Sequence, residues 1–372
     1  MQKHFPIIII LVSITFFIYG VSVGNYEIFP YDLLKEIKIL SNISNENYQR
    51  TIPQFDINSL VKIENSDDII NKRNTLINLI WNTDSLPSSY DQLEIQTNYH
   101  DNRYDDLSNL SHIDKFITIM EYDVNSISYL FHSSSKNNHL VIYHQGHGGD
   151  FFEGKETIQK LLDNGYDVLA FSMPLYGLNN NPEVTLENIG VLKLAHHNQF
   201  HYLDNEKFSS LVYFLEPILI SLNYIESHYD YDSFSFVGIS GGGWTAILYS
   251  AIDERILQTY SVAGTYPIFL RTESQDYGDY EQTLPKLYSS VNYLELYILG
   301  SYGENRKLIQ IFNEFDPCCF AGDSFTIYQS VIENKINQLH LGHFDILLDS
   351  SHTEHKISEY ALTHILSSLN SK

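Results

Sequence analysis

Apolar runs separated by polar or glycine-rich stretches recur along this 372-residue chain. The runs are short and bounded by turn-forming residues, which is typical of buried strands. We predict strands at 116–119, 127–131, 140–143, 167–171, 234–237, 259–263, 308–313 and 344–349. Stretches with helical periodicity predict helices at 67–81, 157–164, 208–227 and about 354–369. The first two strands are expected to pair antiparallel and open a sheet.

The amino-terminal region follows a different pattern. Residues 5–23 form an uncharged apolar run that follows Lys3 and His4. This pattern predicts an export signal within residues 1–24, or an uncleaved membrane anchor as the alternative. Either form places the remaining chain outside the cytoplasm, as a secreted, periplasmic or anchored protein. Residues 25–110 are interpreted as an extension packed on a main domain at 111–372, with 91–111 as polar loop.

The most informative motif follows the predicted strand at 234–237. It is the pentapeptide Gly238-Ile239-Ser240-Gly241-Gly242, and a predicted helix begins directly after it. A serine on a sharp strand-to-helix turn needs small neighbours, because the strand and the helix approach closely there. The motif therefore predicts Ser240 as an activated nucleophile on such a turn.

A glycine-rich loop follows the strand at 140–143. Its sequence is His144-Gln145-Gly146-His147-Gly148-Gly149. Two backbone N–H groups aimed at one point stabilise the oxyanion of a tetrahedral intermediate. We predict that these are the N–H groups of Gly241 and His147. The two imidazoles are assigned to loop structure and packing, because no other ligand residues lie nearby in the sequence.

An acid and a histidine follow later strands in the order Ser, Asp, His. Asp316 follows the strand at 308–313, with Glu314 and Asp323 as rivals. His352 follows the last strand and is the predicted base. His355 is the second candidate, and we expect it to lie on the C-terminal helix, away from the chemistry. An acid at this position orients the histidine and stabilises its charge.

These motifs together resemble the α/β-hydrolase superfamily. The resemblance rests on the loop at 144–149, the pentapeptide at 238–242, Asp316 and His352, and it covers roughly residues 112–370. It implies a mostly parallel central sheet with helices on both faces and a Ser-His-Asp triad at the carboxyl ends of the strands. The loop departs from a plain His-Gly-Gly-Gly pattern because His147 interrupts the glycines.

Two insertions, at about 179–205 and 266–306, are expected to form the substrate pocket as lid-like segments. The first contains His196, His197 and His201, which are interpreted as solvated side chains rather than metal ligands. The second contains Arg271, a candidate partner for a substrate carboxylate. Cys318 and Cys319 are adjacent, so they cannot join distant parts of the fold, and we interpret them as reduced thiols rather than a vicinal disulfide.

Charge and composition narrow the function further. A formal net charge of −24 argues against nucleic-acid binding, because such a surface repels phosphates. We predict a serine hydrolase that cleaves a small-molecule carboxylic ester without a cofactor or metal. The alternatives are an exported peptidase or amidase of the same fold, and a non-catalytic binding protein. If residues 5–23 are not cleaved, we expect them to attach the protein to a membrane.

Overall fold

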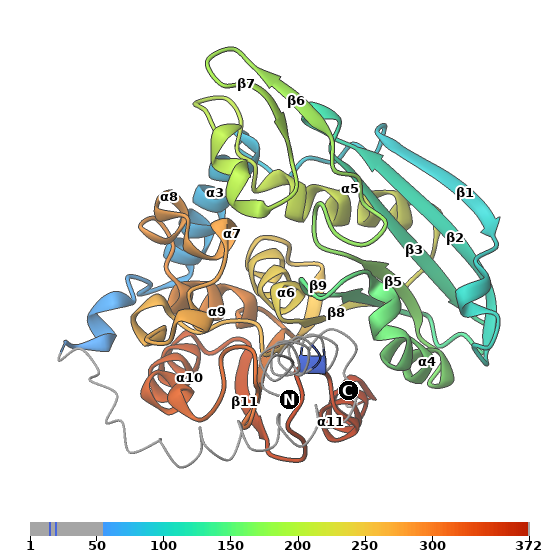
Figure 1. Cartoon of the computed structure of the whole chain (residues 1–372). Coiled ribbons are helices and arrows are strands. Elements are labelled where there is room, and N and C mark those ends of the chain that lie inside the picture. Colours follow the sequence, from blue (N-terminus) through green and yellow to red (C-terminus); the bar gives the residue numbers. More distant parts are fainter. Residues whose placement is uncertain (1–14, 16–18, 21–54, 371–372) are drawn as a thin grey trace, which may run out of the picture. The chain divides into compact units, whose positions relative to one another are not determined.

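A central sheet is the framework of the protein, for which a computed structural model describes residues 15, 19–20 and 55–370. Within these residues, nine strands form one sheet in the order β1-β2-β3-β5-β4-β8-β9-β10-β11 (Figure 1). The strands are β1 (Leu93–Tyr99), β2 (Leu110–Ile119), β3 (Asn125–Ser133), β4 (His139–His144), β5 (Asp167–Phe171), β8 (Ser233–Ile239), β9 (Ile256–Val262), β10 (Lys307–Asn313) and β11 (His343–Asp349). β1, β2, β3 and β5 pair antiparallel, and every pairing from β5 to β11 is parallel.

Helices cover both faces of this sheet. They are α3 (Ser66–Trp81), α4 (Lys155–Asp163), α5 (Val212–His228), α6 (Gly241–Ile252), α7 (Tyr280–Thr283), α8 (Pro285–Tyr288), α9 (Tyr293–Ser301), α10 (Gln329–Leu339) and α11 (Glu359–Asn370). Successive residues of a strand point to opposite faces, and β4 shows the consequence. Leu140 and Ile142 join the core formed with α3, α5, α6, α9 and α10, whereas Val141 and Tyr143 pack with α4 and α11.

The predicted helix at 67–81 is present as α3. Asn65 and Asp68 form a capping box at its first turn, which explains where it begins. Ile69, Leu76 and Ile80 are buried in the core shared with α6. The helix therefore packs its apolar face into the core of the sheet domain.

Two predictions about local structure are wrong. Residues 91–111 were expected to be loop, but they contain β1, which extends the sheet beyond the two predicted antiparallel strands. β1 is an edge strand with no fully buried residue, so its apolar alternation is weak. The last helix begins at Glu359 rather than near residue 354, because the Ser358 Oγ accepts the Ala361 N–H as a helix cap. His355 therefore lies in the preceding loop.

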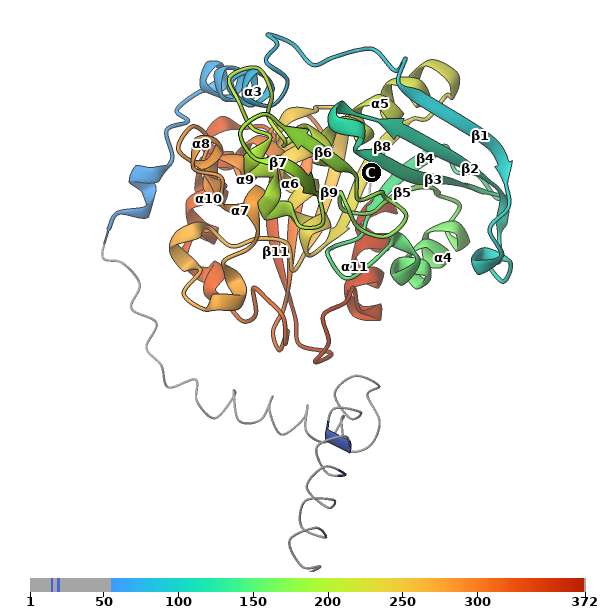
Figure 2. The ribbon, with the colours of Figure 1, turned by 45° about the horizontal axis from the view of Figure 1, so that its top comes forward.

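The two insertions fold into short elements that contact each other. The first contains the β6 (Glu183–Leu186) and β7 (Gly190–Lys193) hairpin and a 3₁₀ helix at His197–Tyr202. The second contains α7, α8 and α9. The Tyr280 hydroxyl of α7 donates to the Asp204 carboxylate of the first insertion. Figures 1 and 2 both show α9 of the second insertion next to α6.

The predicted export signal or anchor at 1–24 lies outside the described residues, except for positions 15, 19 and 20. Among the residues that are described, no helix combines the length and the apolar character needed to cross a bilayer.

Candidate active site

Ser240 lies on the sharp turn between β8 and α6. Its backbone has φ 56° and ψ −124°, a conformation that is rare and strained for a residue other than glycine. The Ser240 N–H donates to the Val262 carbonyl of β9, and the Ser240 carbonyl accepts the N–H of Trp244 in α6. These two bonds hold the turn from both sides, and the side chain remains partly exposed.

The flanking glycines are required by the packing around this turn. A Cβ added at Gly238 would lie 2.1 Å from the Gly242 carbonyl oxygen. A Cβ at Gly242 would lie 2.1 Å from the His144 carbonyl oxygen. Both obstructing atoms are backbone, which cannot move without displacing a strand or a helix. The sequence argument for small residues at these two positions is therefore matched by the geometry.

The glycine-rich loop after β4 lies against the serine. A Cβ at Gly146 would come within 3.1 Å of the Ser240 Oγ, so the loop backbone runs directly past the hydroxyl. Gly241 is the first residue of α6, and the first N–H groups of a helix have no intrahelical acceptor. The His147 imidazole covers Gly241, with its Nδ1 2.7 Å from the position of an added Cβ.

Asp316 follows β10 and is paired with a histidine from the loop after β11. The Asp316 Oδ2 accepts a hydrogen bond from the His355 Nδ1 at 2.8 Å. The Asn313 side chain donates to the same oxygen at 3.0 Å, and the Cys318 N–H donates to Oδ1 at 2.8 Å. Asp316 is buried, and these donors fix the position of its side chain. Of the rival acids, Asp323 is exposed and Glu314 is partly exposed.

The histidine next to Asp316 is thus His355 rather than the predicted His352. The His352 Nε2 lies 3.4 Å from the Asp349 Oδ2, and its Nδ1 accepts the N–H of Glu354. The His355 Nε2 is a buried atom with no hydrogen-bond partner among the described residues. One imidazole nitrogen oriented by a carboxylate and the other available is the arrangement that a general base requires.

The signal for this assignment was present in the sequence. Ser358 followed by Glu359 is a helix-start pattern, because a serine cap precedes an acid in the first turn. Starting the helix there leaves His355 in the loop, on the same side of the sheet as the residues that follow the other parallel strands. The predicted helix start near residue 354 placed His355 on the helix instead.

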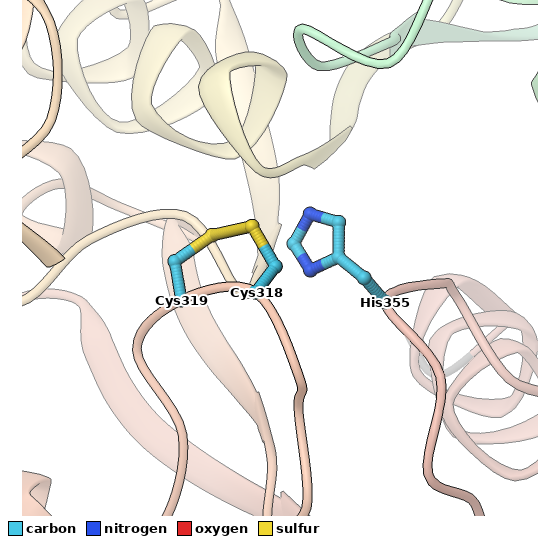
Figure 3. Close-up of side chains that lie close together, drawn as sticks. All are labelled: Cys318, Cys319 and His355. Atoms are coloured by element: carbon cyan, nitrogen blue, oxygen red, sulfur yellow. A yellow bond between two sulfur atoms is a disulfide. The ribbon is translucent and has the colours of Figure 1, made fainter. Parts of the chain in front are cut away.

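A disulfide joins Cys318 and Cys319, which contradicts the interpretation as reduced thiols. Figure 3 shows this disulfide facing the ring of His355. The sulfur atoms and a ring nitrogen of His355 lie within 4.8 Å of one another. Because Asp316 accepts the N–H of Cys318, the disulfide loop and the His355–Asp316 pair form one connected structure.

Arg271 is buried and braces the second insertion. Its Nε donates to the Tyr266 carbonyl at 2.8 Å, and its Nη1 donates to the carbonyls of Tyr277 and Gln282. The guanidinium also lies 4.6 Å from the centre of the Tyr293 ring. These contacts use the side chain inside the protein, and its predicted contact with a substrate carboxylate is not tested by them.

His147 and His197 meet two acidic residues of the second insertion beside Gly241. The pKa of the fully buried Glu281 is lowered: burial would raise it, but the neighbouring His197 and His147 outweigh that effect. The pKa of His147 is raised, because Glu281 and Asp279 outweigh the lowering by burial. His144, from the same loop as His147, is not a member of this cluster. Burial lowers its pKa to about 4, and its Nδ1 donates to the Gln145 carbonyl.

The strand order, the turn at Ser240 and the loops at the carboxyl ends of the strands define the class of the fold. The chain has the α/β-hydrolase fold, as the sequence resemblance implied. No family model matches the chain, and a search of curated proteins found no match.

Solved structures with a similar fold include several esterases. A glucuronoyl esterase from Solibacter usitatus superposes with a TM-score of 0.56 at 11% identity, covering 85% of this chain and 97% of that chain. An acetyl xylan esterase from Thermoanaerobacterium sp. has a TM-score of 0.52 at 12% identity, with coverages of 82% and 94%. An acetyl xylan esterase from Paenibacillus sp. has a TM-score of 0.51 at 14% identity, with coverages of 84% and 99%. At this identity the likeness establishes the fold.

Proposed function

We propose that this protein is a serine hydrolase of carboxylic esters in which Ser240, His355 and Asp316 form the catalytic triad. The observation that supports it most directly is the combination of a strained serine turn with an Asp316–His355 pair whose Nε2 has no partner. β8, β10 and β11 run parallel within one sheet, so the residues after their carboxyl ends lie along the same edge. Structural neighbours named as esterases are consistent with an ester substrate.

The proposed reaction proceeds through an acyl-enzyme. His355 Nε2 takes the proton of the Ser240 hydroxyl while the Ser240 Oγ forms a bond to the carbonyl carbon. The tetrahedral intermediate collapses, the carbon–alkoxy bond breaks, and the alcohol leaves with the proton from His355. A water molecule then gives a proton to the same Nε2 and attacks the acyl carbon, which releases the carboxylic acid and restores the Ser240 hydroxyl.

Two neighbouring groups assist these steps. Asp316 holds the imidazole with its Nε2 available and stabilises the imidazolium that forms. The backbone N–H groups of Gly241 and His147 are the proposed oxyanion donors. They belong to the helix start and the loop that flank Ser240.

A fluorophosphonate probe tests the proposal, because it reacts with a serine only when a neighbouring base activates it. The purified protein should be labelled and should hydrolyse short-chain nitrophenyl esters, whereas Ser240→Ala should lose both properties and keep its circular dichroism spectrum. A folded wild-type protein that is neither labelled nor active would refute the proposal and favour a non-catalytic binding role. Cleavage of amides in preference to esters would favour a peptidase or amidase.

A further inference from the structure

Four potential ligand atoms converge beside the serine turn, on residues that are far apart in the sequence. They are the His147 Nε2, the His197 Nδ1, the Asp279 Oδ2 and a carboxylate oxygen of Glu281, and all lie within 4.8 Å of one another. His147 comes from the loop after β4, His197 begins the 3₁₀ helix of the first insertion, and the two acids belong to the start of α7. Three separate segments of the chain therefore meet at one point.

Most of the spacings between these atoms are close to those of a tetrahedral ligand shell. The His147 Nε2 lies 3.2 Å from the Asp279 Oδ2, from the Glu281 Oε1 and from the His197 Nδ1. The His197 Nδ1 lies 3.2 Å from the Glu281 Oε2 and 4.0 Å from the Asp279 Oδ2. Zinc bonds of about 2.0–2.1 Å to nitrogen and oxygen place tetrahedral ligands about 3.3 Å apart.

Glu281 supplies an independent indication of a cation. Its side chain is fully buried, and neither carboxylate oxygen receives a hydrogen bond from the described residues. A buried carboxylate without hydrogen bonds is strongly destabilising unless a cation compensates it. Both oxygens face imidazole nitrogens at 3.2 Å.

The outer contact of His197 also fits a metal ligand. Its Nε2 lies 2.8 Å from the Pro174 carbonyl oxygen, which can only accept, so this nitrogen carries the proton. The lone pair of the neutral ring is then on Nδ1, which faces the cluster. A metal-bound histidine usually donates its other ring N–H to a backbone carbonyl or a carboxylate in this way.

We propose that His147, His197, Asp279 and Glu281 bind a divalent transition-metal ion, with zinc as the best match. Two imidazoles with two carboxylates suit zinc, whereas calcium and magnesium prefer oxygen ligands throughout. A divalent ion would also balance the charges of the two carboxylates.

A second cluster of histidine and acid residues differs from the proposed metal site in its hydrogen bonds. The His132 Nδ1 and Nε2 lie 3.2 Å from Asp167 and 3.1 Å from Asp114. Here the carboxylates accept other hydrogen bonds, because the Ser133 N–H donates to Asp167 and the Asn98 N–H donates to Asp114. Both acids are therefore satisfied without a metal, and this cluster is a hydrogen-bonded part of the sheet.

The bound metal would fix the two insertions to the catalytic edge of the sheet. It would connect the start of the 3₁₀ helix and the start of α7 to His147, whose ring covers Gly241. The loop that carries the proposed oxyanion donor would thereby be held at the serine turn. Metal binding itself does not depend on catalysis, so the inference can hold whether or not the protein is an esterase.

Metal binding is tested directly on the purified full-length protein. After removal of metal with a chelator, Zn²⁺ titrated against a chromophoric competitor should bind at one equivalent per chain and raise the melting temperature. Co²⁺ in the same site should give the intense visible absorption of tetrahedral coordination. Ser240→Ala should bind both ions like the wild type, which separates this test from the test of catalysis.

Ligand substitutions locate the site. Glu281→Gln should weaken zinc binding by more than the roughly 10–100-fold that is typical for loss of an outer-shell partner. Asp279→Asn is the second variant, because Asp279 is half-exposed and its substitution leaves the buried core intact. Glu273→Gln and His201→Asn are the matched controls, since both side chains are exposed in the same two insertions.

Two results would overturn the inference. One is a folded wild-type protein that takes up no Zn²⁺ or Co²⁺ and melts at the same temperature with and without the ions, which would leave a protonated histidine–carboxylate network. The other is equal binding by the wild type, Glu281→Gln and Asp279→Asn, which would place the metal elsewhere.

Discussion

Replacement of His355 by alanine is the perturbation that separates the two candidate bases. His355 donates to Asp316 at 2.8 Å, and its Nε2 has no hydrogen-bond partner among the described residues. The His352 Nε2 also lacks a hydrogen bond there, but it lies 3.4 Å from the Asp349 carboxylate, and the His352 Nδ1 accepts the N–H of Glu354. We expect His355→Ala to abolish ester hydrolysis while the protein stays folded. His352→Ala, three residues away in the same loop, should leave kcat/KM close to that of the wild type.

The contacts of Asp316 set the expected magnitudes. Without the imidazole, Asp316 still accepts hydrogen bonds from Asn313 and from the N–H of Cys318. Loss of one charge-assisted hydrogen bond costs about 1.5–3 kcal/mol of folding free energy, which is less than the roughly 5–15 kcal/mol of a typical domain. Loss of a triad histidine lowers the rate by about 10⁴–10⁶-fold, or roughly 5–8 kcal/mol of activation free energy.

The assay is kcat/KM for a nitrophenyl ester, measured for both variants together with fluorophosphonate labelling and thermal unfolding. A large rate loss in His355→Ala with a small change in stability would support the assignment. The reasoning would be refuted if His352→Ala lost activity and labelling while His355→Ala kept them, because the base would then be the histidine that faces Asp349.

Three further predictions follow from the same contacts. Asp316→Asn should lower kcat/KM on the order of 10³–10⁴-fold and the exposed Asp323→Asn should not; equal small losses would mean that another acid orients the base. In denaturant titration, Gly242→Ala should destabilise the fold by about 1–3 kcal/mol or more, since its Cβ would meet the His144 carbonyl. Gly148→Ala, whose Cβ meets nothing closer than 4.0 Å, should be nearly neutral, and similar losses would contradict the packing argument. Because burial lowers the pKa of His144 to about 4, the unfolded chain binds its proton first as the pH falls. Folding stability should therefore drop between about pH 6.5 and pH 4, by roughly 3 kcal/mol from this group, and His144→Gln should reduce the drop in denaturant titrations.

The serine turn was predictable because its causes are local. Gly238 and Gly242 are needed where a strand and a helix approach, and that need is visible in five consecutive residues. The core strands were predictable for a similar reason, since parallel strands buried on both faces appear as continuous apolar runs. β1 was missed because an exposed edge strand has only a weak apolar pattern.

The partner of Asp316 was decided by a contact across 39 residues. Two histidines follow β11 within a few positions, and sequence order alone does not say which ring turns toward the acid. The start of α11 at Glu359 settles this, because it leaves His355 in the loop while His352 turns toward Asp349. The predicted last strand was enough to locate the loop that carries the histidine. The packing of that loop determines that His355, and not His352, contacts Asp316.

Residue types and their periodicity were sufficient to predict the α/β-hydrolase fold and the position of Ser240 on a sharp turn. Both depend on interactions between neighbours in the sequence. The cluster of His147, His197, Asp279 and Glu281 has no such signature, since 84 residues separate His197 from Glu281. Each member alone is an ordinary loop histidine or acid. Only the folding of the two insertions over the serine turn brings their nitrogen and oxygen atoms to distances of 3.2–4.0 Å around the buried Glu281 carboxylate.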